Sequence, residues 1–95
     1  MEDKFITIYT LNMLSQKGFN SYHFPTQSIA QKWLRETKCL HVEISYMYGN
    51  YWIYDILTIP KHDMVGLSDR PLIHYSTYEE ALEAGIQEAL KLVEE

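Results

Sequence analysis

The residues most able to do chemistry by type and spacing are Cys39 and His41. They lie two positions apart, so a strand would place both on one face, where a thiol and an imidazole can form a nucleophilic pair. No further residues in the sequence form an oxyanion hole or an acid that would orient this pair. We therefore expect Cys39 to be an inert, buried or half-buried thiol, and we expect the protein not to be an enzyme.

His41 and Glu43 share a strand face in the same way and could ligate a metal ion. A metal site needs further ligands, and metal-binding helices space their histidines three or four residues apart. The remaining histidines are scattered and show no such spacing: His23, His62 and His74. We expect no metal site and no cofactor.

The stretch from residue 61 to 70 gathers several reactive side-chain types, and we predict it to be a loop. Loops on rigid scaffolds carry function more often than strands do. Its candidate ligand-binding residues are Lys61, His62, Asp63 and Arg70. Gly66 is its single glycine and no phosphate-binding pattern is present, so a plain connecting loop is the alternative.

Positive charge is sparse in this acidic chain, which has a net charge of −5. Residues 49–95 hold nine acidic and three basic residues, and the largest basic group is Lys32, Arg35 and Lys38, interrupted by Glu36. Proteins that bind nucleic acid through its phosphates present a clustered basic face. We therefore do not expect nucleic-acid binding, and a nucleic-acid-associated or regulatory protein that uses this cluster is the alternative function.

Five aromatic residues crowd nine positions of the chain: Tyr46, Tyr48, Tyr51, Trp52 and Tyr54. In nucleic-acid-binding proteins such rings stack on bases, but there Lys and Arg alternate with them. Between Cys39 and Pro60 there is no basic residue apart from His41. We expect these rings to fill the core or to contact another protein.

The chain of 95 residues is long enough for one domain, which we place at residues 1–95 with its core in residues 25–95. Its composition, 46% hydrophobic and 22% charged, is typical of a folded soluble protein. No apolar run approaches the roughly 18–20 residues of a membrane-spanning helix, and the acidic N-terminus is a poor signal peptide. A single cysteine suits a reducing compartment, so we expect a cytoplasmic protein without membrane contact.

Apolar periodicity predicts the elements that position these residues. An N-terminal helix is expected from Thr7, its N-cap, to Lys17, before Gly18; the β-branched residues 6–10 leave a strand as the alternative. Beyond it we expect a helix over 25–37, strands over 40–48 and 51–59, a loop over 60–71, a strand over 72–75 and a helix over 76–95. This is an α+β fold: an N-terminal helix, then helix–strand–strand–strand–helix, with helices packed on one face of a small antiparallel sheet.

The loop of the central hairpin decides which side chains share a face. A two-residue loop would set Asp55 opposite Ile44, in the middle of the apolar face. Burying an unpaired carboxylate costs several kcal/mol, more than any preference between turn types. We therefore predict a three-residue loop, which places Trp52, Tyr54 and Ile56 on the face of Val42, Ile44 and Tyr46.

The final helix has a capping box at Ser76 or Thr77, each with a glutamate three positions later. Its apolar residues fill one arc of about 180°, with Gly85 near the centre, where close approach of another backbone would explain the missing side chain. The opposite side carries Glu80, Glu83, Glu88, Glu94, Glu95 and Lys91. We predict this side to be a solvated face rather than a docking surface.

The reverse face of the sheet is predicted to expose apolar residues: Met47, Ile53, Leu57 and Ile59. A small monomer rarely leaves such a patch in water, so we expect a homodimer to form across this possible interaction surface. The N-terminal helix could cover the patch instead, through Ile8, Leu11 and Leu14. These residues predict a small protein-interaction module that self-associates, with an unknown protein as a further partner.

Two stretches, PTQSIAQKWLRE followed by HVEI and the C-terminal STYEEALEAGIQEALKLV, resemble a group of short proteins without an assigned activity from gut Bacteroidetes and their prophages. The resemblance covers residues 5–19, 25–44 and 76–93, and it implies a phage or mobile-element origin and a helical N-terminal segment. It implies no catalytic residues.

The helix–strand–strand–strand–helix order is also similar to that of the double-stranded-RNA-binding domain. In that family a lysine-rich start of the last helix grips phosphates. The matching residues here, Thr77-Tyr78-Glu79-Glu80, are acidic, so the resemblance implies the topology without the RNA contact.

Overall fold

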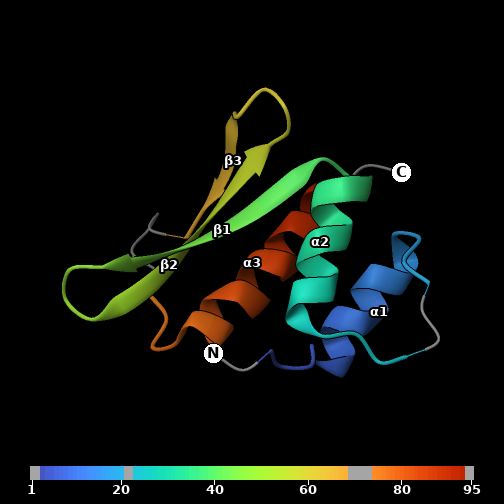
Figure 1. The fold of residues 1–95 in the computed structure, drawn as a ribbon, viewed down its shortest axis with the longest axis horizontal. Coiled ribbons are helices and arrows are strands. Elements are labelled where there is room, and N and C mark those ends of the chain that lie inside the picture. Colours follow the sequence, from blue (N-terminus) through green and yellow to red (C-terminus); the bar gives the residue numbers. More distant parts are fainter. Residues whose placement is uncertain (1–2, 21–22, 69–73, 94–95) are drawn as a thin grey trace.

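The computed structural model describes residues 3–20, 23–68 and 74–93. In chain order these contain α1 (Ile8–Gln16), α2 (Gln27–Thr37), β1 (Leu40–Met47), β2 (Tyr51–Thr58), β3 (Met64–Leu67) and α3 (Tyr78–Leu92). The strands form an antiparallel sheet in the order β1-β2-β3 (Figure 1). The predicted α+β fold, with an N-terminal helix before helix–strand–strand–strand–helix, is confirmed.

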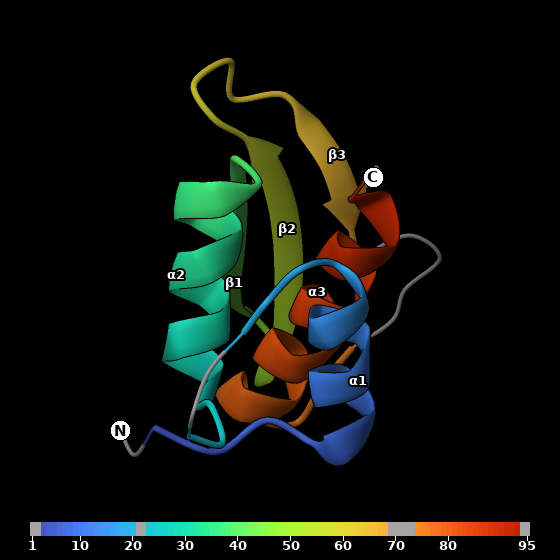
Figure 2. The same ribbon diagram turned by 90° about the vertical axis from the view of Figure 1, so that its right-hand side faces the viewer.

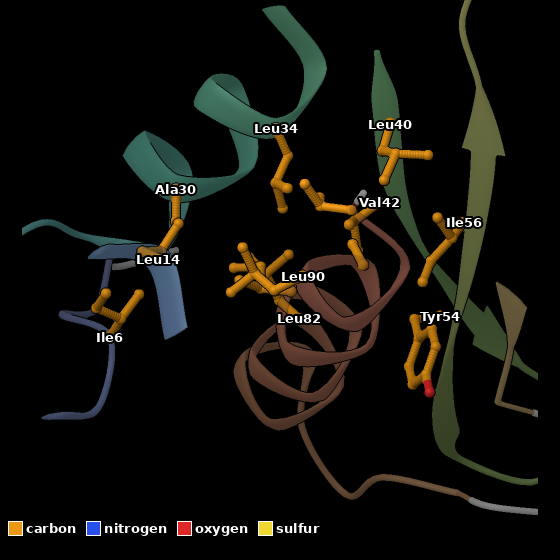
Figure 3. Close-up of a cluster of buried hydrophobic side chains, with 13 residues drawn as sticks. Ile6, Leu14, Ala30, Leu34, Leu40, Val42, Tyr54, Ile56, Leu82 and Leu90 are labelled. Carbon is orange, nitrogen blue, oxygen red and sulfur yellow. The ribbon is translucent and has the colours of Figure 1, made fainter. Parts of the chain in front are cut away.

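The helices form layers on one side of the sheet (Figure 2). α2 and α3 pack on the strands, and α1 packs against α3. Figure 3 shows the resulting core, in which α3 lies between two groups of side chains. One group comes from the N-terminal segment, α1 and α2, and includes Leu14 and Leu34; the other comes from the sheet and includes Val42 and Ile56.

Each helix begins at a threonine whose hydroxyl accepts a hydrogen bond from a backbone N–H three residues later. The pairs are Thr7 with Thr10 (3.2 Å), Thr26 with Ile29 (3.4 Å) and Thr77 with Glu80 (3.1 Å). Such caps satisfy one of the N–H groups that a helix start leaves unpaired. The predicted cap at Thr7 is confirmed, and Thr77 rather than Ser76 begins the last helix.

α1 ends at a glycine, as predicted. Gly18 has a φ of +104°, a conformation that favours a residue without a Cβ. Phe19 N donates to Leu14 O at 3.0 Å and Gly18 N donates to Ser15 O at 3.2 Å. These two bonds define a Schellman motif, which stops the helix and turns the chain away from it.

The β1–β2 hairpin has the predicted three-residue turn, residues 48–50. Ile44 pairs with Tyr54, and the other core-facing pairs are Val42 with Ile56 and Tyr46 with Trp52. Asp55 pairs with Glu43 on the reverse face instead of entering the apolar side of the sheet. Keeping the carboxylate out of the core between sheet and helices therefore predicted the register correctly, and Asp55 is half-buried on the reverse face.

The prediction of a loop over residues 60–71 is wrong, because β3 lies within it. Gly66 pairs with Ile56, and a Cβ built at Gly66 would lie 2.8 Å from Ile56 Cδ1, so the glycine permits the strand to pack there. Residues 72 and 73 of the predicted strand at 72–75 lie outside the described residues. Its last residue, Tyr75, exchanges backbone hydrogen bonds with Trp52, at 2.8 and 3.0 Å.

Candidate interaction surface

The reverse face of the sheet does not present the patch that the sequence predicts. Ile53 and Leu57 are only 6% and 7% exposed, so the expectation that they form an interaction surface is wrong. Both belong to the central strand, where Leu57 pairs with His41 and Met64 and Ile53 pairs with Ser45. Met47 is half-buried and Ile59 is exposed. α1 packs against α3, so it does not lie on this face either.

The candidate ligand loop is a compact turn between β2 and β3. Its backbone is tied to Thr58: His62 N donates to Thr58 O at 2.8 Å and Asp63 N donates to Thr58 Oγ1 at 3.0 Å. The side chains of Lys61, His62 and Asp63 are exposed, and Arg70 lies outside the described residues. These contacts order the backbone of the turn and leave the side chains of Lys61, His62 and Asp63 in solvent.

Cys39 is exposed, so the expectation of a buried or half-buried thiol is wrong. The residue lies between α2 and β1 with a φ of +57°, outside the strand that was expected to align it with His41. His41 Nδ1 is buried and has no hydrogen-bond partner among the described residues. Within residues 3–20, 23–68 and 74–93, no group of three or more His, Cys, Asp or Glu side chains could hold a metal ion.

The basic cluster lies on α2 and is partly engaged with the protein itself. Lys38 Nζ lies 5.5 Å from the centre of the Trp33 ring, a cation–π distance. Arg35 is half-buried, and Lys32 is exposed beside the exposed Glu36. Of the three basic side chains, Lys32 is the exposed one, while Arg35 and Lys38 are half-buried.

Glu83 is not part of a solvated face, contrary to the prediction. Its Oε2 accepts hydrogen bonds from Thr7 N at 3.0 Å, from Thr7 Oγ1 at 3.1 Å and from Thr10 Oγ1. Its Oε1 accepts from Gln27 Nε2 at 3.0 Å, and both Thr10 and Gln27 are buried. One carboxylate on α3 thus holds the starts of α1 and α2.

A groove of about 220 Å³ lies between the starts of α2 and α3. Several of its polar groups are already used inside the protein. Gln27 Nε2 donates to Glu79 O at 2.8 Å, and Gln31 Nε2 donates to Val42 O at 2.6 Å. The Asp3 carboxylate accepts a hydrogen bond from Ser28 N at 3.2 Å. The polar groups that line the groove therefore hold parts of the protein together.

The backbone of β1 alternates between β2 and the outside. Cys39 O accepts from Ile59 N at 2.9 Å, so the odd-numbered residues of the strand direct their N–H and C=O groups toward β2. The residues that direct these groups away from β2 are Leu40, Val42, Ile44 and Tyr46. Gln31 occupies the outward oxygen of Val42.

The outward backbone groups of Ile44 and Tyr46 form what we call the open edge. No described residue hydrogen-bonds the backbone of Ile44 or Tyr46 from this side. Natural sheets protect such edges with charged residues, proline, bulges or short strands. Residues 44–47 contain no charge and no proline, and the β1–β2 register has no shift. The opposite edge differs, since β3 has four residues and a register shift against β2.

Aromatic side chains accompany the open edge. Tyr46 is 57% exposed and Tyr48 is fully exposed. The Tyr46 ring lies 4.8 Å from that of Trp52, which in turn contacts Tyr78 at the start of α3 at 5.5 Å. Figure 1 shows this end of the hairpin projecting beyond α2. Rings at an exposed strand end therefore lie next to unpaired backbone groups.

Comparison with known proteins finds no match: no family model, no curated protein and no solved structure is similar to this chain. Among the described residues, none of the helices has both the length and the apolar character needed to cross a membrane.

Proposed function

We propose that the protein is a small cytoplasmic protein-interaction module, without catalytic activity, that binds another polypeptide by strand addition at the open edge. One observation carries this proposal: the unprotected outer side of β1 at Ile44 and Tyr46. An extended chain that pairs there satisfies backbone groups that water otherwise solvates.

The energetics favour a moderate, main-chain-based interaction. Each backbone hydrogen bond contributes a net of about 0.5–1.5 kcal/mol, so the open edge alone supports weak binding. The exposed rings of Tyr46 and Tyr48 add apolar area and orient the incoming strand. Exposed Cys39 fits the proposed cytoplasmic setting, because a free surface thiol persists in a reducing compartment.

The test is affinity capture from a lysate of the native host with the parent and with Tyr46→Pro. Proline removes an N–H that points away from β2, so the hairpin keeps its own ladder while the edge loses a donor. We expect the captured proteins to be lost with Tyr46→Pro and only reduced with Tyr46→Val, which loses the ring but retains the N–H and a strand-forming side chain. Circular dichroism confirms that both variants fold.

Two outcomes would contradict the proposal. Equal capture by the parent and Tyr46→Pro would mean that the open edge is not the contact. Capture that nuclease treatment abolishes, and that Lys32→Ala with Arg35→Ala also abolishes, would favour the alternative of a nucleic-acid-associated protein.

A further inference from the structure

The open edge is bounded on both sides, which limits what can pair with it. On one side Gln31 Nε2 already occupies Val42 O, at 2.6 Å. On the other side the chain leaves the strand after Met47 and enters the turn. An incoming strand therefore finds free backbone groups at Ile44 and Tyr46 and must place its own outward groups opposite these two residues.

We propose that the strand that binds there is β1 of a second copy of this chain, antiparallel, about a two-fold axis at Ser45. This inference rests on the proposed function and names the partner. Ile44 then pairs with Tyr46 of the second copy, and Tyr46 with Ile44 of the second copy. Each such pair exchanges both backbone bonds, so about four hydrogen bonds form.

The neighbouring register is disfavoured by the protein itself. A two-fold axis at Ile44 would pair Tyr46 with Val42 of the second copy, whose oxygen is bonded to Gln31. Forming that register would break an existing hydrogen bond in each copy. The axis at Ser45 uses only backbone groups that no described residue occupies.

Side chains also fit the axis at Ser45. Ile44 faces Tyr46 of the second copy, and pairs of a β-branched and an aromatic residue stabilise antiparallel strands. Glu43 faces Met47 of the second copy, so no carboxylates oppose each other directly. The two copies carry −5 each, and their mutual repulsion predicts tighter association as salt is raised.

An axis at Ser45 sets Tyr48 of the second copy, the first residue after its β1, opposite Val42, so the incoming strand ends where Gln31 of α2 is bonded. α2 lies beside the first part of β1, at Val42, while the hairpin end projects away from it (Figure 1). At about 3.3 Å per residue, an axis at Ser45 separates the two Val42 residues by about 20 Å along the strands. Both copies keep their helices on the same face, because core-facing residues pair with core-facing residues.

A cross-linking experiment tests the axis. Ser45→Cys, in a Cys39→Asn background that removes the native thiol, places two thiols opposite each other in a pair that is not hydrogen-bonded. Cα atoms in such pairs are about 4.5 Å apart, within the range that a disulfide spans. Glu43→Cys in the same background is the matched control, since its two thiols would be about 13 Å apart along the strands.

We expect mild oxidation to link Ser45→Cys into a covalent dimer and to leave Glu43→Cys without a covalent link. The parent should dimerise reversibly in sedimentation equilibrium. Equal cross-linking of both variants, or a parent that stays monomeric near millimolar concentration, would overturn the proposal. If the parent is monomeric but Tyr46→Pro still abolishes capture of other proteins, the second copy is excluded while the proposed function stands. If the parent is monomeric and Tyr46→Pro captures the same proteins as the parent, both the second copy and the proposed function are refuted.

Discussion

At the scale of single residues, Gly85 marks a close approach of α3 to the sheet. The sequence predicted its place on the apolar arc, and the residue is buried there. A Cβ built at this position would lie 2.6 Å from Val42 Cγ1 and 3.1 Å from Tyr54 Cβ. The close neighbours are therefore side chains of the sheet, not another backbone as expected from the sequence.

Gly85→Ala should destabilise the fold, although alanine favours a helix by about 1 kcal/mol over glycine. Overpacking against Val42 typically costs about 1–3 kcal/mol, which outweighs that gain. Urea unfolding of the parent, Gly85→Ala, Val42→Ala and the double variant measures the coupling. The alanine at position 85 should cost less when Val42 is shortened; an equal cost in both backgrounds would mean that the two side chains do not compete for space.

The free energy of unfolding should depend on pH in the alkaline range because of Tyr54. Burial, with a further contribution from the negative charge of Glu88, raises the pKa of the Tyr54 phenol to about 12 from its ordinary value of 10.0. The same causes raise the pKa of Tyr75, whose ring lies 6.1 Å from that of Tyr54. The folded state therefore holds the phenol proton more tightly than the unfolded chain does.

Stability from this proton is complete below pH 10 and is lost as the pH rises from 10 toward 12. Tyr54→Phe cannot lose a proton, so its free energy of unfolding should fall less than that of the parent over this range. Urea titrations at pH 8, 10 and 11 measure the difference, with Tyr48→Phe, at a fully exposed position, as the control. Parallel curves for the parent and Tyr54→Phe would refute this account.

At the scale of elements, the sequence predicted what local chemistry determines. Thr7 and Thr77 can cap a helix in any fold, and Gly18 can end one. The hairpin register followed from a single carboxylate, Asp55, that the core could not accept. These predictions succeeded because each depended on residues close together in the chain.

The predictions that failed concern residues whose contacts lie far away in the sequence. β3 is held by pairing with β2 and by the fit of Gly66 against Ile56. A strand of four residues is too short to show the alternation of apolar and polar residues that predicts a strand. Glu83 looked solvated because its partners, Thr10 and Gln27, come from helices far away in the sequence. The open edge was missed because the sequence could not show that Gln31 bonds the outer oxygen of Val42 while no described residue bonds the outer side of Ile44 or Tyr46.

Glu83→Ala should loosen α1 from the rest of the fold. The change removes the acceptor for Thr7 N and for the buried hydroxyl of Thr10, and leaving such donors unsatisfied costs about 1–3 kcal/mol. Thermal unfolding should show a lower melting temperature, and α1 amides should exchange faster. Glu36→Ala, which removes an exposed carboxylate from α2, is the control; equal effects of both changes would rule out a special role for Glu83.

At the scale of the whole molecule, the sheet has helices on one face and two unlike edges. Helices occupy the core-facing side, while β3 protects its edge through shortness and a register shift. β1 is eight residues long, and among the described residues its outer backbone groups are hydrogen-bonded only at Val42. This asymmetry is the reason to expect that the molecule pairs through β1.

Amide hydrogen exchange, read residue by residue by NMR, tests the open edge most directly. In the separated chain at low concentration, Ile44 and Tyr46 amides should exchange quickly, because they point away from β2, while the Ser45 amide should exchange slowly. At high concentration a second copy should protect Ile44 and Tyr46 to the level of Ser45. If Ile44 and Tyr46 are already as protected as Ser45 at the lowest concentration, the edge is covered within one chain and the central claim is contradicted.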